Sequence, residues 1–242
     1  MSQDNCLGIL LPDDGPDDYE WYTLAEQAVD LPRIAVGKVP SDGHHAPGAL
    51  LSLGDVERLA PVGESLVEQA GARAVVWACT SASFIGGLAW AREQCTGLEA
   101  RLGVPVTSTA LAFLEALSRL GHDRVDLLSP YPDDVTLRLV SFLREGGVGV
   151  VNDHALDCPY AEDSHRADIL GEVRRFRERY PDTSRPLLIP DTAINSLRLR
   201  EVMNREAGRE VLTANQVTLW AGLRRLAGAE PPQALLGRLA GN

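Results

Sequence analysis

Long apolar runs, closely paired cysteines and an excess of positive charge are all absent from this 242-residue sequence. No apolar stretch approaches the roughly 18–20 residues that a helix needs to span a bilayer, so an integral membrane protein is not expected. The first residues, 1–5, lack the basic region and the long apolar segment of a secretory signal. We therefore expect the protein to be cytoplasmic.

The four cysteines are widely spaced, and no two of them form a Cys-x-x-Cys pair. A disulfide framework or a zinc site is therefore not predicted, and we expect no bound metal. Cys6 in an apolar run and Cys95 in a helical stretch are expected to serve packing. The adjacent His44 and His45 are interpreted as part of a polar loop. The glycine spacing of nucleotide-binding loops is missing too, so no nucleotide cofactor is expected.

The formal net charge of −11 predicts an acidic surface. Such a surface repels the phosphates of nucleic acids and anionic lipids, so neither nucleic acid nor a membrane is an expected partner. A small anion is still compatible with this charge, because backbone N–H groups at helix N-termini can bind it. The expected partner is thus a small molecule, and the sequence leaves a homo-oligomer open.

Short apolar runs alternate with longer amphipathic stretches along the chain. The runs are rich in Val, Ile and Leu and end at turn-forming or small polar residues, which is typical of parallel strands buried on both faces. The predicted strands are residues 6–11, 33–39, 73–78, 104–107, 124–129, 148–152, 186–189 and 210–213. The predicted helices include residues 109–120, 163–180, 197–205 and 216–226, where apolar positions recur at helical spacing.

This alternation predicts βαβ units and an α/β fold. The two halves follow a related plan, because each has a strand that ends in a small polar loop leading into a helix. Residues 79–81 occupy this place in the first half and residues 191–193 in the second. Ligands of such sheets bind beyond the carboxyl ends of the strands, so we expect both loops to face one cleft.

The most informative of these loops holds a thiol at the end of an apolar strand. Cys79 is followed by the small hydroxyl residues Thr80 and Ser81, and a helix is predicted from about residue 82. A helix N-terminus favours the thiolate form of a cysteine, and the neighbouring N–H and hydroxyl groups can bind a carboxylate. Cys79 is therefore a candidate reactive group, and the alternative is a small buried cysteine without chemistry.

The corresponding loop of the second half begins with Asp191 and Thr192, after the apolar run 187–189 and a proline. The carboxyl group of Asp191 could act as a general acid/base that faces Cys79. The alternative is a carboxylate that only caps the following turn.

Two further loops follow predicted strands and complete the set of candidates. Tyr131 stands between two prolines, and its hydroxyl could donate to a substrate carboxylate or to an enolate oxygen. The alternative for Tyr131 is a packed loop aromatic. Pro12 and Asp13 lie in a turn after the first strand, and their position predicts that they border the same cleft.

Five segments, in order across nearly the whole chain, resemble the aspartate/glutamate racemase superfamily, specifically its maleate cis–trans isomerase and arylmalonate decarboxylase branch. They are Gly8–Pro12, Ala78–Ser81, Ser129–Tyr131, Ile189–Thr192 and Thr213–Trp220. The resemblance implies two pseudo-symmetric, Rossmann-like α/β lobes with parallel sheets and an active site in the cleft between them. It also implies that no metal or organic cofactor takes part. The first lobe is expected to span residues 1–108 plus 211–242, and the second lobe residues 109–210.

Carried over by position, Cys79 matches the first of two thiols that members of this superfamily use, one from each lobe. Thr80 and Ser81 match the loop that binds a substrate carboxylate, and Tyr131 matches a tyrosine that stabilises an oxyanion. Thr192 is carried over with the second-lobe loop as a substrate-binding residue.

The first-strand loop and the second catalytic position depart from the family pattern. Pro12 and Asp13 fall on the loop after the first strand. Isomerases usually show an Asn a few residues further along this loop, whereas this chain has the stretch Asp13-Asp14-Gly15. Asp191 stands where these enzymes normally carry their second cysteine. An ionised Asp191 close to Cys79 would raise the pKa of the thiol and repel a dianionic substrate. Either Asp191 is protonated, or the substrate carries an amide, hydroxyl or ammonium group where a second carboxylate would sit.

Three functions remain compatible with the sequence. The first is an isomerase or racemase of a small carboxylic acid, with Cys79 as nucleophile or proton carrier and Asp191 as the opposing acid/base. The second is a cofactor-free decarboxylase of a malonate-type acid, in which a single thiol protonates an enolate. The third is a non-catalytic protein that binds a small carboxylate in the same cleft.

Overall fold

The structure is a computed structural model that describes residues 5–14, 19–27, 31–227 and 232–241. Strands and helices alternate along the chain, as the sequence predicts. In order they are β1 (Cys6–Asp13), α1 (Tyr19–Gln27), β2 (Arg33–Pro40), α2 (Pro47–Leu53), α3 (Val56–Glu68), β3 (Ala74–Trp77), α4 (Ser81–Phe84), α5 (Gly87–Leu102), β4 (Val106–Ser108), α6 (Thr109–Leu120), β5 (Arg124–Ser129), α7 (Asp133–Glu145), β6 (Gly149–Ala155), α8 (Ala161–Arg166), α9 (Ile169–Arg179), β7 (Leu187–Ile189), α10 (Arg200–Ala207), β8 (Val211–Thr213), α11 (Ala214–Arg225), α12 (Gln233–Leu236) and the 3₁₀-helix η1 (Gly237–Ala240).

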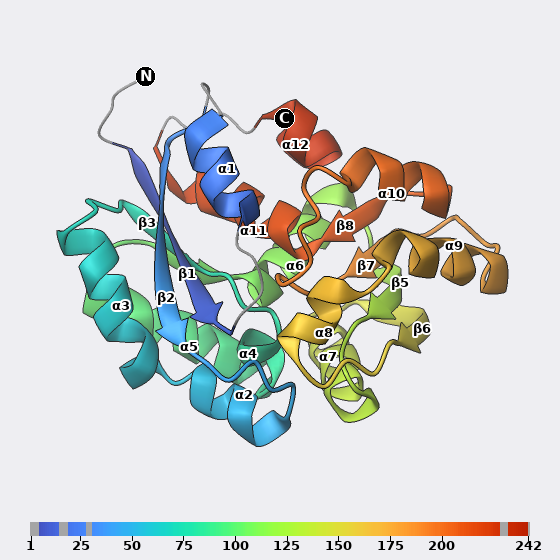
Figure 1. Cartoon of the computed structure of the whole chain (residues 1–242), viewed down its shortest axis with the longest axis horizontal. Coiled ribbons are helices and arrows are strands. Elements are labelled where there is room, and N and C mark those ends of the chain that lie inside the picture. Colours follow the sequence, from blue (N-terminus) through green and yellow to red (C-terminus); the bar gives the residue numbers. More distant parts are fainter. Residues whose placement is uncertain (1–4, 15–18, 28–30, 228–231, 242) are drawn as a thin grey trace.

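The strands form two four-stranded sheets, ordered β2-β1-β3-β4 and β6-β5-β7-β8 (Figure 1). All strand pairs within these sheets are parallel. In each sheet the first strand of that half lies between the second and the third, so the two halves repeat one topology. We call the half built on β1–β4 the first lobe and the half built on β5–β8 the second lobe. The predicted α/β fold with two related lobes is confirmed.

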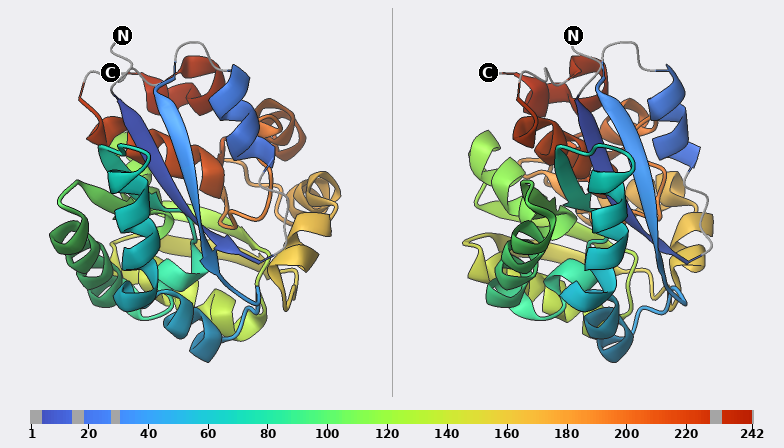
Figure 2. Two further views of the ribbon diagram at one scale, coloured as in Figure 1. Left: turned by 60° about the vertical axis from the view of Figure 1, so that its left-hand side comes forward. Right: turned by 90° about the vertical axis from the view of Figure 1, so that its left-hand side faces the viewer.

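Each predicted apolar run contains a strand, with ends that shift by a few residues. All residues of β3 and β7 are buried, as expected for parallel strands that are covered on both faces. Figure 2 shows how the first lobe achieves this, with α3 and α5 on one face of its sheet and α1 and α11 on the other. In the second lobe, α7 packs against β6, and α9 and α10 pack against each other.

One segment that is predicted as a single helix forms two helices in the structure. The sequence predicts a single helix over residues 163–180, and the structure has two, α8 and α9, separated by Ala167 and Asp168. Ala167 adopts extended backbone angles, and the Asp168 side chain accepts a hydrogen bond of 3.0 Å from the N–H of Gly171. The helical spacing of apolar residues continues through this point, but the carboxylate of Asp168 starts a new helix by capping it.

The C-terminal part of the chain connects the two lobes. β8 pairs with β7 in the second sheet, and α11, which follows directly, packs against β3, β4 and α6. Gly222 lets α11 approach the first sheet closely, because a Cβ atom there would lie 2.8 Å from Leu7 and 2.9 Å from Val76. The sequence predicts that the chain returns to the first lobe at residue 211, and this domain boundary stays a prediction. In the structure, contact with the first sheet begins with α11.

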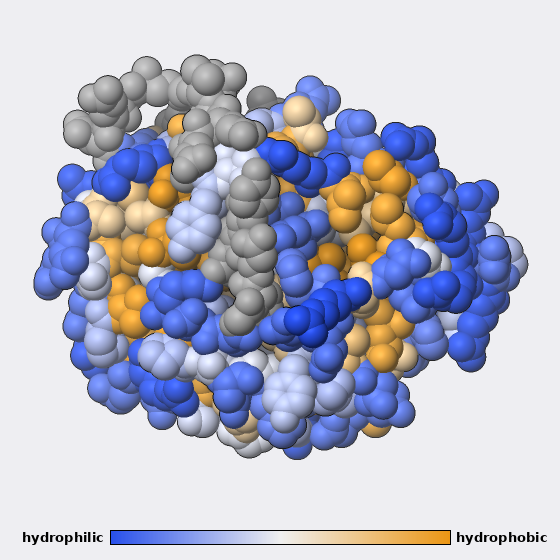
Figure 3. Space-filling model, viewed as in Figure 1, coloured by the Kyte–Doolittle hydropathy of each residue, from blue (hydrophilic) through white to orange (hydrophobic). Residues whose placement is uncertain are grey.

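The largest hydrophobic cluster joins both lobes. It contains β1 and β3 side chains together with residues of the second sheet such as Leu127 and Leu188. A smaller cluster lies under α9 and α10. Hydrophilic residues cover most of the face in Figure 3, and hydrophobic residues show in separate areas. In the described ranges no helix has the length and apolar character needed to cross a membrane.

Candidate active site

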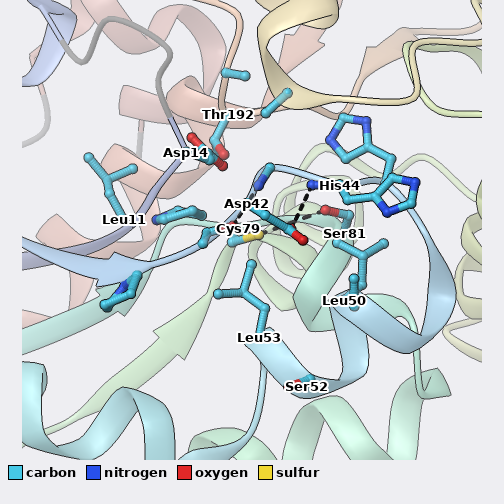
Figure 4. A pocket seen from close by; sticks show the side chains of 18 of the residues that line it. Leu11, Asp14, Asp42, His44, Leu50, Ser52, Leu53, Cys79, Ser81 and Thr192 are labelled. Carbon is cyan, nitrogen blue, oxygen red and sulfur yellow. Dashed lines mark hydrogen bonds between the residues drawn. The ribbon is translucent and has the colours of Figure 1, made fainter.

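Loops at the carboxyl ends of β1, β2, β3 and β7 converge on a cavity of about 470 Å³ that both lobes line. This volume lies within the range of small-molecule sites. The lining includes Asp14, His45, Cys79, Ser81, Asp191 and Thr192. Figure 4 shows Cys79 and Ser81 between two kinds of wall, with Leu50 and Leu53 on one side and Asp14 and Thr192 on the other.

Cys79 follows β3, a central strand of the first sheet, and its side chain is buried. The backbone around it is held firmly, because the N–H of Ala78 donates to Leu10 at 2.8 Å and the Ser83 hydroxyl donates to the carbonyl of Cys79 at 2.6 Å. Its Sγ atom lies 3.7 Å from the hydroxyl oxygen of Ser81. The thiol therefore has a fixed position at the wall of the cavity.

Burial raises the pKa of the Cys79 thiol to about 12, and the nearby carboxyl groups of Asp14 and Asp191 act in the same direction. The N–H of Ala82 and the hydroxyl of Ser81 lower it, but by less. Burial thus outweighs the preference for thiolate that a helix N-terminus is expected to give, and the helix that follows, α4, is only four residues long. The predicted influence of Asp191 on the thiol is confirmed in direction.

Asp191 follows β7 and faces the same cavity from the second lobe. Its Oδ1 atom accepts a hydrogen bond of 3.0 Å from the N–H of Ala193. Its Oδ2 atom is buried and finds no hydrogen-bond partner within the part of the chain that the structure describes. One oxygen thus shapes the turn, as a capping carboxylate would, while the other is available for a ligand or a proton.

The imidazole of His45 lies on the side of this oxygen atom. Its Nε2 atom lies 4.0 Å from Asp191 Oδ2, and both side chains are buried. The backbone N–H of His45 donates to Pro159 at 2.8 Å, and the ring Nδ1 donates to the carbonyl of Cys158 at 2.9 Å. The loop after β2 is therefore attached to the second lobe. The interpretation of His44 and His45 as an ordinary polar loop holds for the exposed His44 and misses the buried His45.

Asp13 and Asp14, which follow one another at the end of β1, point in different directions. Asp13 is exposed and lies 3.9 Å from the Nζ atom of Lys38. Asp14 lines the cavity, and burial together with the neighbouring Asp191 raises its pKa from 3.8 to about 6. The structure thus brings Asp14 to the cavity and not Asp13, whose substrate-binding role stays a prediction.

Tyr131 and Thr80 lie behind the cavity wall. Tyr131 is fully buried, and its hydroxyl donates to the carbonyl of Pro190 at 2.5 Å, directly before Asp191. Burial raises the pKa of Tyr131 well above its ordinary value, so the hydroxyl stays protonated. Thr80 is also buried, and its hydroxyl has no hydrogen-bond partner among the described residues. Pro12, Ser81 and Thr192, the other predicted binding residues, do line the cavity.

A buried carboxylate outside the predicted site holds the second-lobe loop in place. Glu20 of α1 accepts hydrogen bonds from the N–H groups of Ser196 at 3.1 Å and Leu197 at 2.7 Å, and from the side chain of Asn215 at 2.8 Å. Burial raises the pKa of Glu20, and these hydrogen bonds oppose the rise. Nothing in the local pattern around Glu20 distinguishes it from an ordinary surface residue of a helix.

The sequence analysis does not name His45 and Asp14 as site residues, although their positions in the chain could have indicated both. Because β2 lies beside β1 and all carboxyl ends meet at one edge, the loop after β2 had to border the cleft, and His45 lies in it. Asp14 is one residue from the predicted Asp13.

Cys6 and Cys95 are buried in a strand and a helix. Within the described residues no group of three or more His, Cys, Asp or Glu side chains is arranged to hold a metal ion.

Several solved structures share this fold over nearly the full chain. A liganded double mutant of arylmalonate decarboxylase, with a glycine changed to cysteine and a cysteine to serine, is 26% identical, with a TM-score of 0.84 and coverage of 98% of this chain and 99% of that one. A maleate-bound mutant of the Pseudomonas putida S16 maleate isomerase is 19% identical, with a TM-score of 0.79 and coverage of 96% and 98%.

The Nocardia farcinica maleate cis–trans isomerase, as a cysteine-to-serine mutant with a covalently bound succinylcysteine intermediate, is 21% identical, with a TM-score of 0.76 and coverage of 93% and 96%. No curated protein sequence matches the chain significantly. The family model for arylmalonate decarboxylase matches residues 54–240, which include both candidate catalytic residues. The chain therefore belongs to the arylmalonate decarboxylase family, as the resemblance to the aspartate/glutamate racemase superfamily predicts.

Proposed function

We propose that the protein is a cofactor-independent isomerase or racemase that moves a proton at the carbon next to the carboxylate of a small organic acid. Cys79 of the first lobe and Asp191 of the second lobe are the proton carriers. The observation that supports this most is that the two side chains are buried and line one cavity from opposite lobes. A planar carbanion between them would receive a proton from either side.

The protonation state of Cys79 favours a proton donor over a nucleophile. With a pKa of about 12, the group is a neutral thiol at pH 7 and carries the proton that it must deliver. In the proposed step, the Asp191 carboxylate removes the proton from the substrate carbon, and the electron pair enters an enediolate. The Cys79 S–H then gives its proton to the other face of that carbon and becomes a thiolate, which inverts the configuration.

The lining of the cavity favours a substrate with one carboxylate and an apolar substituent. Three carboxyl groups, those of Asp14, Asp42 and Asp191, line the space against one arginine, Arg58, and this excess of negative charge disfavours a second substrate carboxylate. Leu11, Leu50 and Leu53 all line the cavity, and Leu50 and Leu53 lie together on one side of Cys79 (Figure 4). In this proposal the hydroxyl of Ser81, which lies 3.7 Å from the Cys79 Sγ atom, binds the reacting carboxylate.

Decarboxylation of a malonate-type acid is the second candidate. It is favoured by the family to which the chain belongs and by the neutral thiol, since this reaction needs a single proton donor. The bond between the central carbon and one carboxylate would break, carbon dioxide would leave, and the electron pair would form an enediolate. Cys79 would protonate that carbon, and solvent would restore the thiol.

Proton NMR in deuterated buffer separates these reactions in one panel. The protein is incubated with single enantiomers of α-substituted monocarboxylic acids, with maleate and with phenylmalonate. Exchange of the α-proton for deuterium with loss of chirality supports the first proposal, and release of carbon dioxide with one deuterium in the product supports the second. Formation of fumarate from maleate would instead indicate nucleophilic attack by Cys79.

The variants Cys79→Ala and Cys79→Ser should abolish turnover and leave the circular-dichroism spectrum unchanged. A Cys79→Ala protein that retains activity would overturn the role of the thiol. If no acid turns over but one of them raises the melting temperature, the protein binds a carboxylate without catalysis, and both proposals fail.

A further inference from the structure

We infer that Asn215, in the first turn of α11, is a positioning residue that orients the carboxylate of Asp191 for proton transfer. Its side-chain amide holds the peptide group between Thr192 and Ala193, and the N–H of that group binds one oxygen of Asp191. The effect of Asn215 on turnover rests on the proposed function, whereas the hydrogen bonds that carry the inference do not.

The carboxylate of Asp191 takes its orientation from one hydrogen bond. Its Oδ1 atom accepts the N–H of Ala193 at 3.0 Å, and its Oδ2 atom has no hydrogen-bond partner among the residues that the structure describes. The torsion about the Cβ–Cγ bond of a carboxylate has only broad, roughly two-fold preferences of its own. The direction of the Ala193 N–H therefore determines which oxygen faces the turn and which one is left for a substrate.

The turn that carries this N–H has little backbone support. Residues 191–199, all of which the structure describes, contain no strand and no helix. A backbone hydrogen bond of 3.3 Å to the carbonyl of Asp191 closes the turn. The side chains of Tyr131 and His165 bind the carbonyl oxygens of residues 190 and 193, at 2.5 and 3.0 Å. Neither of these two bonds is made to the peptide group that holds Asp191 Oδ1.

Asn215 binds that peptide group directly. Its Nδ2 atom donates to the carbonyl oxygens of Thr192 at 3.3 Å and of Ile194 at 3.2 Å. The Thr192 carbonyl and the Ala193 N–H belong to one planar peptide group, so holding the oxygen also fixes the direction of the N–H. Hydrogen bonds at both ends of such a group strengthen each other. Asn215 therefore acts on Asp191 through one rigid unit.

Glu20 determines how the amide of Asn215 is turned. Its Oε2 atom lies 2.8 Å from the same Nδ2 atom, and Glu20 is the acceptor because backbone N–H groups point at it too. One hydrogen of Nδ2 thus goes to Glu20, and the other is shared between the two carbonyl oxygens. The buried amide oxygen, Oδ1, has no partner among the described residues. The donor side of Asn215 therefore makes the contacts that hold the loop.

This arrangement predicts an effect on the reaction step and not on substrate binding. Asn215 is fully buried and does not line the cavity in the part of the chain that the structure describes. In the proposed reaction the Oδ2 atom of Asp191 has to meet the C–H bond of the substrate within a narrow range of directions, and a small misplacement lowers the rate. The Ser81 hydroxyl, to which we assign carboxylate binding, lies on the other lobe. Loss of the Asn215 amide should therefore lower kcat and leave KM nearly unchanged.

The first test needs no substrate. Hydrogen exchange at the N–H of Ala193 is measured by NMR in the wild-type protein, in Asn215→Ser and in Asn152→Ser. Without the amide, exchange at Ala193 should be about tenfold faster in Asn215→Ser. Asn152→Ser is the matched control, because the Asn152 amide also donates to a carboxylate, that of Asp126 at 3.0 Å, away from the cavity. Unchanged exchange in Asn215→Ser, or an equal increase in both variants, would overturn the inference.

The second test uses turnover of the acid that the proton-NMR panel identifies. In Asn215→Ser, kcat should fall by about 10- to 100-fold and KM should stay within about twofold, while Asn152→Ser keeps both values. Glu20→Gln leaves Asn215 in place but removes the acceptor that orients its amide, so it should lower kcat too. A residue that only stabilises the fold would lower the melting temperature and leave the kcat of the folded protein unchanged. Unchanged kcat in whichever of these two variants folds contradicts the positioning role.

The two tests fail in different ways. If the wild-type protein turns over a substrate and Asn215→Ser keeps its kcat, the positioning role is wrong while the proposed function stands. If the wild-type protein turns over no acid, the proposed function fails, and hydrogen exchange at Ala193 alone decides whether Asn215 holds the peptide group beside Asp191.

Discussion

Cys79 illustrates how a residue can have the expected position and an unexpected chemical state. It stands at the end of a buried strand beside Ser81, where a reactive thiol was predicted. The surroundings exclude water so completely that the neutral thiol is favoured, and two carboxyl groups add to this preference. The same residue is therefore better suited to give a proton than to attack carbon.

The coupling of Cys79 to the two carboxyl groups can be measured by alkylation. Because Asp14 and Asp191 both raise the pKa of the thiol, Asp14→Asn and Asp191→Asn should each move the pH profile of iodoacetamide modification to lower pH. Mass spectrometry of the peptide that contains residue 79 separates this signal from the other three cysteines, all of which are buried. Asp13→Asn, which alters the exposed neighbour, is the control; a profile that is the same in every variant would show that the groups do not interact.

Asp14 should also make stability depend on pH. Its pKa in the folded protein is about 6, above the ordinary 3.8, so folding favours the protonated form. The free energy of unfolding of the wild type should therefore fall as pH rises from about 4 to about 6. Asp14→Asn should not show the part of this fall that comes from ionisation of Asp14. Above pH 6 the variant should be more stable by at most about 3 kcal/mol, as urea unfolding at several pH values would show. A constant difference between the two proteins across this range would contradict the expectation.

At the scale of elements, α1 and the loop after β7 depend on each other. Glu20 of α1 accepts hydrogen bonds from two backbone N–H groups of this loop. The loop carries Asp191 at its start and joins α10 further on. A carboxylate that binds backbone N–H groups orders such a segment without a strand or a long helix, which explains why periodicity did not reveal it.

Glu20→Gln should loosen this loop. An amide offers one oxygen and places its NH₂ group among donors, so the free energy of unfolding should fall by about 2 kcal/mol. Hydrogen exchange at the N–H groups of Ser196 and Leu197 should become faster. Glu57→Gln is the control, because Glu57 lies on the surface in an ion pair with Arg101 and has no contact with the loop. Unchanged exchange at both amides in Glu20→Gln would contradict the role of Glu20.

At the scale of the whole molecule, further connections besides that of Glu20 hold the lobes in one arrangement. α11 packs on the first sheet directly after β8 of the second sheet, and α7 contacts α4 and α5. The loop after β2 forms backbone hydrogen bonds to residues 159–161, through His45 and Gly43. The cavity is built from both lobes, so its geometry depends on these connections.

Gly222→Val should weaken the attachment of α11 to the first sheet. The added side chain would overlap Leu7 and Val76, and overpacking of this kind costs about 1–3 kcal/mol. Thermal unfolding would show the loss as a lower melting temperature. Gly48→Ala is the control, because a Cβ at that helical position meets nothing within 4 Å, and its melting temperature should stay equal or rise slightly. A stable Gly222→Val protein would show that the helix can move away from the sheet.

The local sequence pattern was sufficient to predict the strands and the loops that follow them. Apolar runs identify strands because parallel strands are buried on both faces, and the loops after those strands, with Cys79 and Asp191, follow from the topology of α/β sheets. The order of the family-like segments then identified the family, which the matching family model confirms. The break between α8 and α9 was missed because a single capping carboxylate, and not a change of period, starts the second helix.

The sequence by itself thus determined the α/β class and the two-lobed plan, and it indicated Cys79 and Asp191 as candidates for chemistry. Only the tertiary structure decided that Asp14 and not Asp13 faces the cavity, that His45 lies beside Asp191, and that Cys79 keeps its proton. The physical reason is that these properties come from burial and from charges contributed by loops more than thirty residues apart in the chain. Desolvation and electrostatic interaction depend on distance in space, and spacing along the sequence does not contain that distance.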